Sequence, residues 1–334
     1  VSSRCTSCAK GSFALITDDT IEWLLAGDPV IRWQVKRDLL GDPTWEDERE
    51  RTLEHGWVRR FLDQRTPDGL WPEGRWTGMP WVLLTLMDCG IPKHSAEGAE
   101  AAGVFLDRRL PSGEVAKQIA RMDLCHLGFW IRIGGYFTPT DERMSQIADC
   151  LFDMQMADGG WNCSIRKKPT RHSSFHTTFN VLEGLREFEP STTRFKEAEA
   201  RAMEFMLQHQ MYRSDKTGEV IRECFLHLTH PSYWHYTVLR GLDYMRSTPQ
   251  IADERLSDPI AQLRCRAMSD GRWIVEKRIP GIVHFDMEEQ GKPSRWNTLR
   301  ALRVLQARSK SAEIAVSEKT YPQPGTSKKP VASE

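Results

Sequence analysis

The segment QMADGGW, residues 155–161, recurs along the chain and decides its fold. Close copies are QRTPDGLW at 64–71 and RAMSDGRW at 266–273, and degenerate copies are RRLPSGEV and YRSDKTGEV. The close copies end in Asp-Gly-x-Trp. The glycine suits the positive φ of a turn that ends a helix, and the tryptophan can pack against the neighbouring repeat. The spacing indicates a structural repeat of roughly fifty residues.

An apolar segment with helical spacing follows each turn after a loop. These segments are VIRWQVKRDLL from Val30, WVLLTLMDCG from Trp81, HLGFWIRIGGYF from His126, HTTFNVLEGL from His176, HYTVLRGLDYM from His235 and WNTLRALRVL from Trp296. More charged, amphipathic segments such as RFKEAEARAMEFMLQHQ alternate with them. Alternation of the two kinds predicts inner helices wrapped by outer helices. We therefore predict an all-α fold, an (α/α)6 toroid of about six helical hairpins.

The toroid is predicted to span residues 18–308 as one domain. Residues 1–17 are expected to be a flexible segment, and the polar, Pro-, Ser- and Lys-rich stretch 309–334 is expected to be disordered. The role of a CxxC at Cys5 and Cys8 stays open, because a zinc site needs a second ligand pair at matching spacing.

Charge and apolar content exclude several classes of protein. The 334 residues carry 46 basic and 46 acidic side chains, which gives no electrostatic reason to expect a nucleic-acid partner. The sequence contains no run of about 18 uncharged apolar residues, so no integral membrane segment is expected. Eight scattered cysteines and the lack of an apolar leader predict reduced thiols in the cytoplasm.

Three histidines, His126, His176 and His235, stand at or near the starts of consecutive inner segments. In a ring of hairpins all inner helices run the same way, so their N-termini gather at one rim. Neighbouring helix axes lie about 8–10 Å apart, so side chains at these starts can meet. Asp123 and Cys125, spaced Asp-x-Cys, stand at the first of these starts.

These motifs resemble the β-subunits of protein prenyltransferases, in the terpenoid cyclase superfamily that also contains squalene and oxidosqualene cyclases. In that family an Asp-x-Cys at one inner-helix start holds zinc with a histidine at the next, in a Gly-Gly, Lys-Pro, His-Thr context. The matching residues here are Asp123-Leu-Cys125, Gly159-Gly160, Lys168-Pro169 and Phe175-His176-Thr177. The resemblance implies that Asp123, Cys125 and His176 bind Zn²⁺, which activates a substrate thiol or water.

Other side chains could replace or supplement these ligands. Cys163 and His235 are the main additional candidates, and four protein ligands would make the zinc structural rather than catalytic. Lanthionine cyclases share the toroid and use two cysteines and a histidine on zinc. Cys125-His126 and Trp161-Asn-Cys163 are similar to those pieces, in reversed order. Each residue alone also has an ordinary structural role, as a helix cap or an apolar filler.

The chain departs from prenyltransferases where they bind a diphosphate. Trp76 stands where the histidine is expected, and Ala120 replaces one basic residue before Asp123. The expected anion contacts at this rim are Lys117, Arg121, Arg75 and Arg171. An apolar inner wall with Trp81, Phe129, Trp130 and Trp234 is expected to bind an isoprenoid-like or otherwise apolar substrate.

Three functions remain open. The first is a zinc-dependent, transferase- or cyclase-like enzyme acting on an apolar or thiol-bearing substrate, with a possible missing partner subunit and catalytic residues still unknown. The second is a metal-free toroid that binds a ligand or partner without chemistry. The third is a scaffold that a structural zinc stabilises through Cys163 or His235.

Overall fold

The fold is built from helices. The structure, a computed structural model, describes residues 16–320, with side chains to residue 313. Within that range it forms no named strand, only isolated bridges such as Arg213 with Val220. The all-α prediction is confirmed. No helix in the described range is long and apolar enough to cross a bilayer. Cys5, Cys8 and residues 321–334 lie outside that range.

Each of the apolar segments forms a helix. These helices are α2 (Pro29–Val35, continued by a π-helical turn, Lys36–Leu40), α5 (Met79–Cys89), α8 (Leu124–Phe137), α10 (Phe175–Phe188), α12 (Val238–Met245) and α14 (Arg295–Thr320). Two boundaries differ from the prediction. α12 starts after His235, because Thr237 caps it and residues before Thr237 form a loop. α14 continues to Thr320, so the expected disorder from residue 309 is wrong for 309–320.

The remaining helices are shorter or amphipathic. They are α1 (Asp18–Leu25), α3 (Trp45–Glu50), α4 (Gly56–Leu62), α6 (Ala96–Arg109), α7 (Val115–Arg121), α9 (Arg143–Asp153), α11 (Thr193–Gln208) and α13 (Ser257–Cys265). α11 illustrates why they form: Thr192 caps it, and Phe195, Ala198, Ala202 and Met206 recur on one buried face at helical spacing.

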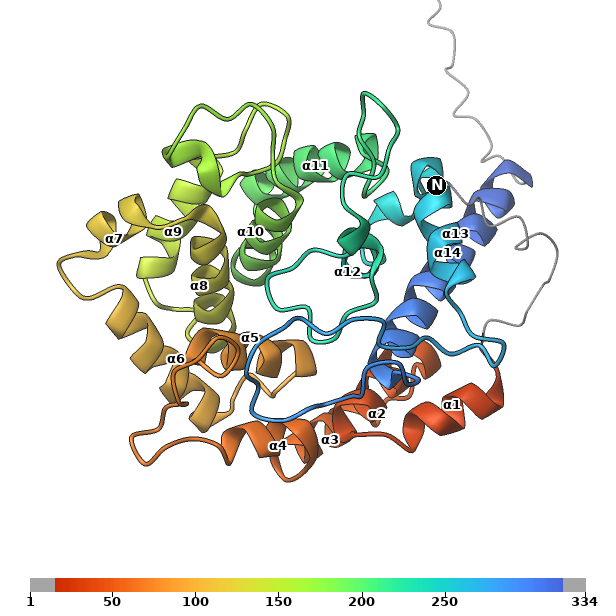
Figure 1. Cartoon of the computed structure of the whole chain (residues 1–334), viewed down its shortest axis with the longest axis horizontal. Coiled ribbons are helices and arrows are strands. Elements are labelled where there is room, and N and C mark those ends of the chain that lie inside the picture. Colours follow the sequence, from red (N-terminus) through yellow and green to blue (C-terminus); the bar gives the residue numbers. More distant parts are fainter. Residues whose placement is uncertain (1–15, 321–334) are drawn as a thin grey trace, which may run out of the picture.

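Successive helices follow one another around the molecule, and the first and last of them meet (Figure 1). α14 packs against both α12 and α2. Arg303 of α14 donates to Gln34 of α2 at 2.9 Å and pairs with Asp38 of the π-helical turn at 2.9 Å. The C-terminal inner helix is therefore joined directly to the N-terminal one.

The Asp-Gly-x-Trp turns share one hydrogen bond. The indole N–H groups of Trp71, Trp161 and Trp273 each donate to the carbonyl ten residues earlier, at 2.7, 2.6 and 2.8 Å. Those carbonyls lie near the ends of α4, α9 and α13. The turn glycines have positive φ, 78°, 95° and 73°, as the motif requires. Each tryptophan thus ties its turn to the preceding outer helix.

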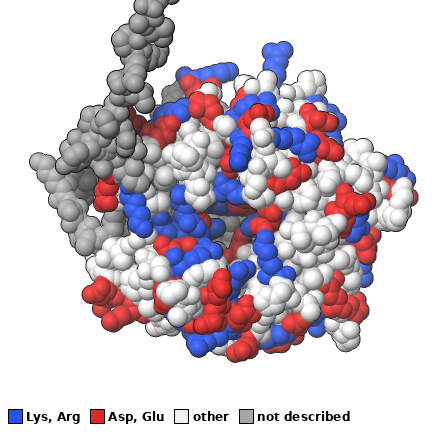
Figure 2. Space-filling view, turned by 180° about the vertical axis from the view of Figure 1, so that it is seen from behind, with Lys and Arg blue, Asp and Glu red and all other residues white. Residues whose placement is uncertain are grey.

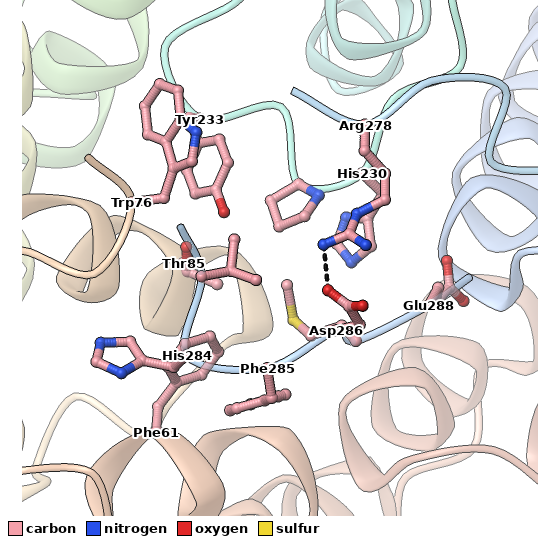
Figure 3. A pocket seen from close by; sticks show the side chains of 13 residues that line it. Phe61, Trp76, Thr85, His230, Tyr233, Arg278, His284, Phe285, Asp286 and Glu288 are labelled. Atoms are coloured by element: carbon pink, nitrogen blue, oxygen red, sulfur yellow. Dashed lines mark hydrogen bonds and ion pairs between the residues drawn. The ribbon is translucent and has the colours of Figure 1, made fainter. Parts of the chain in front are cut away.

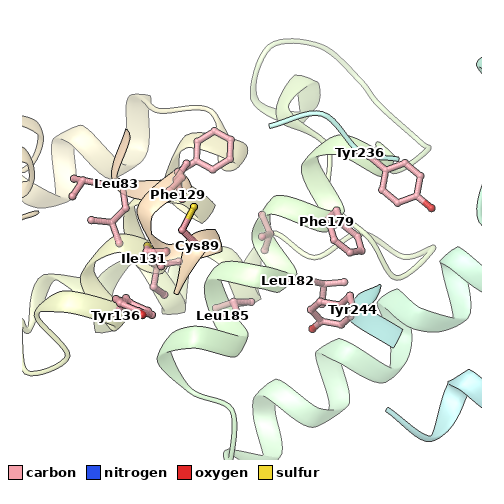
Figure 4. Close-up of a cluster of buried hydrophobic side chains, with 14 of the residues drawn as sticks. Leu83, Cys89, Phe129, Ile131, Tyr136, Phe179, Leu182, Leu185, Tyr236 and Tyr244 are labelled. Carbon is pink, nitrogen blue, oxygen red and sulfur yellow. The ribbon is translucent and has the colours of Figure 1, made fainter. Parts of the chain in front are cut away.

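α8 and α10 make the closest contact between inner helices. A Cβ atom built on Gly184 would lie 2.3 Å from the carbonyl oxygen of Gly128, so only glycine allows this approach. Apolar side chains of α5, α8, α10 and α12, among them Leu83, Phe129 and Phe179, form the buried cluster around these helices (Figure 4). The contact also brings the N-terminal turns of α8 and α10 together.

Candidate functional site

Hydrogen bonds hold the loop after Trp161 beside the starts of α8 and α10. Asn162 accepts the Ser164 N–H at 2.9 Å and donates to the His172 carbonyl at 2.8 Å, which shapes the short 3-10 helix Cys163–Arg166. Arg166 donates to the carbonyls of Ile119 and Met122, both at 2.6 Å, at the end of α7. These bonds place Cys163 against the first turn of α8.

Two cysteines from neighbouring repeats meet at this point. The Cys163 sulfur accepts the backbone N–H of Cys125 at 3.2 Å and the hydroxyl of Thr177 at 3.2 Å. Two donors therefore converge on one sulfur, the first from the N-terminal turn of α8 and the second from that of α10.

The surroundings of the two thiols shift their pKa values in opposite directions. Hydrogen bonding by the Cys125 thiol is the largest cause that lowers the pKa of Cys163, to about 7, and Thr177 adds to it against the effect of burial. The same bond and burial raise the pKa of Cys125. A free cysteine has a pKa of about 8.5, so Cys163 carries a substantial thiolate fraction near neutral pH.

The predicted ligands Asp123 and His176 are engaged elsewhere. The Asp123 carboxylate pairs with Lys167 at 2.7 Å. Nδ1 of His176 accepts the Tyr236 N–H at 2.8 Å, and this bond joins α10 to the loop before α12. Burial first, and then nearby positive groups including Arg222, lower the pKa of His176 to about 4. The imidazole is therefore neutral, and only Nε2 is free of that bond.

The donor set matches zinc in part. Within the described residues no group of three or more His, Cys, Asp or Glu side chains is placed to hold a metal ion, so Asp123, Cys125 and His176 do not form a ready-made triad. The Cys125–Cys163 pair supplies two sulfurs of the kind that zinc prefers. Beside it, Nδ1 of His126 is buried without a hydrogen-bond partner, and burial lowers the pKa of that imidazole. Two sulfur ligands are thus close together, but among the described residues no third ligand is placed to join them on a metal ion.

Aromatic side chains fill the mouth beside these helix starts. Trp234 stacks on His235, with ring centroids 3.9 Å apart, and its ring lies 5.0 Å from that of His176. Trp81 meets Phe129 edge to face at 5.4 Å. Trp81 and Trp234 therefore lie beside the starts of α5, α8 and α10. Trp130 is core: it faces Phe105 of α6 at 6.3 Å.

A pocket lies next to this aromatic mouth, between the loops 228–237 and 276–288 (Figure 3). Trp76 and Tyr233 stack at 4.1 Å on one side of it, and Arg278 pairs with Asp286 on another. Nε2 of His230 is buried there without a hydrogen-bond partner. Trp76 thus forms a wall of this pocket.

The predicted anion contacts are spread along the surface. Lys117 on α7 pairs with Glu114 at 3.6 Å, and the guanidinium of Arg75 lies over the Trp76 ring at 5.2 Å. Arg121 and Arg171 are exposed. Sequence reasoning missed Thr177, which stands inside the quoted Phe175-His176-Thr177 motif, and Lys167, which directly precedes Lys168-Pro169.

Ion pairs link the inner helices at mid-height. Arg132 of α8 pairs with Asp88 of α5 at 2.7 Å and with Glu183 of α10 at 3.0 Å. Arg240 of α12 pairs with the same Glu183 at 2.5 Å. Burial opposes ionisation of Glu183, but Arg240 and Arg132 outweigh it and lower its pKa to about 2. Charged side chains therefore join α5, α8, α10 and α12 to one another.

On the face opposite to Figure 1, acidic and basic side chains border a hollow near the middle (Figure 2). This distribution agrees with the ion pairs that join α5, α8, α10 and α12.

Comparison with known proteins adds no assignment. No protein-family model matches this chain, and no curated protein matches it significantly.

Proposed function

We propose that this chain is an α/α toroid enzyme of the terpenoid cyclase and prenyltransferase type, with a zinc-dependent reactive centre at Cys125 and Cys163. The observation that carries the proposal is the convergence of the Cys125 N–H and the Thr177 hydroxyl on the Cys163 sulfur, which brings cysteines of two neighbouring repeats together. The repeated tryptophan turns and the contact of α14 with α2 support the toroid of about six hairpins.

In this proposal the two sulfurs hold the zinc, and Asp123, His126 or His176 completes the set. Bound zinc would supply a Lewis acid that activates a substrate thiol or a water molecule. Cys163 is suited to metal binding because its thiol ionises near neutral pH. Asp123 would exchange Lys167 for the metal, whereas His176 keeps Nδ1 on Tyr236 and has Nε2 to offer.

The substrate class follows from the surroundings of the pair. Trp81, Phe129 and Trp234 offer an apolar surface at the mouth, and the ion pairs of Arg132 and Arg240 occupy the level below. We therefore place a thiol-bearing or apolar substrate in the mouth rather than deep in the ring. Arg75 and Arg171 are the proposed contacts for any anionic group it carries.

Zinc titration tests the proposal. Untagged protein with Cys5 and Cys8 replaced by serine is reduced, stripped of metal and titrated with zinc. We expect about one zinc per chain. Cys125→Ala and Cys163→Ala should lose it with unchanged circular dichroism, whereas Cys224→Ala, at an exposed site, should keep it. Failure to bind zinc, or full binding by both rim variants, would contradict the proposal.

Chelation separates a catalytic from a structural zinc. Removing a catalytic zinc should lower the melting temperature only slightly, because the helices pack without it. A large fall would instead favour a scaffold, since structural zinc contributes folding free energy directly.

A further inference from the structure

We propose that Cys125 and Cys163 also form an exchange-active dithiol, which closes into an intramolecular disulfide when it meets a low-molecular-weight disulfide. The inference goes beyond the zinc proposal and does not need it. If both hold, oxidation removes the two thiols that bind the metal, so zinc and the disulfide exclude each other.

The arrangement of the two sulfurs carries this inference. The Cys163 sulfur accepts the backbone N–H of Cys125 at 3.2 Å although 38 residues separate the two cysteines, and both side chains are half-buried rather than sealed in the core. The Gly128–Gly184 contact and the bonds of Arg166 hold them there from both sides. The approach is therefore built by the fold and does not depend on a flexible surface loop.

The two cysteines have different roles in the exchange. Donors converge on Cys163, so its sulfur is the one that best carries the negative charge of an attacking thiolate. Cys125 is the neighbouring cysteine, since its own N–H donates to that sulfur, and it therefore stands in the position of a resolving thiol. Cys89 is buried, and Cys150 contacts the Arg166 guanidinium at 2.8 Å, so neither has this arrangement.

The reaction balances with a disulfide RSSR as the oxidant. The Cys163 thiolate attacks one sulfur of RSSR, the R–S–S–R bond breaks, and the first RS⁻ leaves and takes up a proton as RSH. Cys125 then loses its proton and attacks the Cys163 sulfur of the mixed disulfide, and the second RS⁻ leaves as RSH. Overall, two cysteine thiols are oxidised and one disulfide is reduced.

Peptide mapping tests the pairing. The reduced, metal-free full chain is incubated with oxidised glutathione, blocked with iodoacetamide and digested with trypsin without reduction. Trypsin gives peptide 122–132, with Cys125, and peptide 144–166, with Cys150 and Cys163. We expect these two peptides to be joined by a disulfide. Cys150→Ala resolves the ambiguity and should leave the linked peptide intact.

Single substitutions separate the two steps. Cys125→Ser should trap glutathione on Cys163, and Cys163→Ser should prevent both the mixed and the internal disulfide. Failure to link the peptides in the wild type, accumulation of the mixed disulfide there, or linkage through Cys150 would overturn the proposal. Zinc titration of the same sample is read separately, so either proposal can fail alone.

Thr177 offers a test that keeps both cysteines. Its hydroxyl donates to the Cys163 sulfur, so Thr177→Val should slow glutathionylation at neutral pH by roughly tenfold. Thr177→Ser keeps the hydroxyl and should react at nearly the wild-type rate. Equal rates in the two variants would show that the donor does not activate Cys163.

Discussion

Two turns of the molecule share one scaffold and differ in chemistry. At 161–178 the Trp161 carbonyl accepts the Ser174 N–H at 2.8 Å, and the Trp161 N–H donates to Thr178 at 2.9 Å. At 273–298 the same two bonds are made by Trp273, with Ser294 at 2.7 Å and Thr298 at 3.0 Å.

The residues that these scaffolds present are different. Two positions after the tryptophan, the first turn carries Cys163 and the second carries the fully buried Val275. Two positions after the serine, the first carries His176 and the second carries Trp296, which stacks on His230 at 4.5 Å. The backbone bonds therefore specify the fold in both turns, and a few substituted side chains turn one of them into a candidate site.

The largest effect is expected at the close contact between α8 and α10, which lies beside the first turn only. Gly184→Ala should lower the free energy of unfolding by about 3 kcal/mol, because its Cβ would meet the Gly128 carbonyl. Chemical denaturation measures this. Gly103→Ala on α6 is the control: no atom lies within 4 Å of its added Cβ, so it should be neutral or slightly stabilising. Similar losses in both variants would argue against the close contact.

Replacing the turn tryptophans probes the shared scaffold. Trp161→Phe and Trp273→Phe should each cost about 2 kcal/mol, since each loses a buried indole hydrogen bond and some packing. Only Trp161→Phe should also change the rate at which iodoacetamide modifies Cys163. If both variants change that rate equally, the two turns are not independent.

The pH dependence should differ between the two turns, since His176 titrates and Trp296 does not. The folded pKa of His176 is about 4 against an ordinary value of 6.5, so its neutral form stabilises the fold above pH 6.5. Stability should fall as pH drops from 6.5 towards 4, by about 1–2 kcal/mol. His176→Asn keeps an acceptor for the Tyr236 N–H and should flatten this part of the curve. An unchanged slope would show that His176 does not titrate in that window.

The smallest expected effect comes from giving the first turn the residue of the second. Cys163→Val should cost at most about 1 kcal/mol, chiefly from the donors left without their sulfur acceptor. Thermal denaturation should therefore change little, while zinc binding and thiol reactivity at this rim disappear. The reciprocal Val275→Cys should create no low-pKa thiol, and a reactive thiol there would refute the special role of α8.

The sequence was sufficient for the helices because their apolar spacing and the tryptophan turns are local signals. The late start of α12 could not be predicted, since Arg240 holds the preceding loop through the carbonyls of Tyr233 and His235. Sequence reasoning also selected Cys125 and kept Cys163 as a supplementary ligand. It could not reveal that the Tyr236 N–H donates to Nδ1 of His176, because that bond joins residues 60 positions apart.

The interior charges were equally hidden. Arg132, Glu183 and Arg240 are isolated charges within the apolar segments, and each finds its partner on a different helix. Only the packing of these helices against one another turns them into buried pairs. A pattern of residue types along one helix carries no information on such distant partners.

The ion pairs of Arg303 constrain the order in which parts of the chain can pack during synthesis. Its guanidinium lies on α14, whereas its partner Asp38 lies near the beginning of the chain and is only 7% exposed. Until the ribosome has released α14, Asp38 and Asp243 lack this counter-charge, and their burial is costly. Arg37 and Arg246 pair with these carboxylates as well, so docking of α14 is the step that completes their charge balance and not the step that begins it.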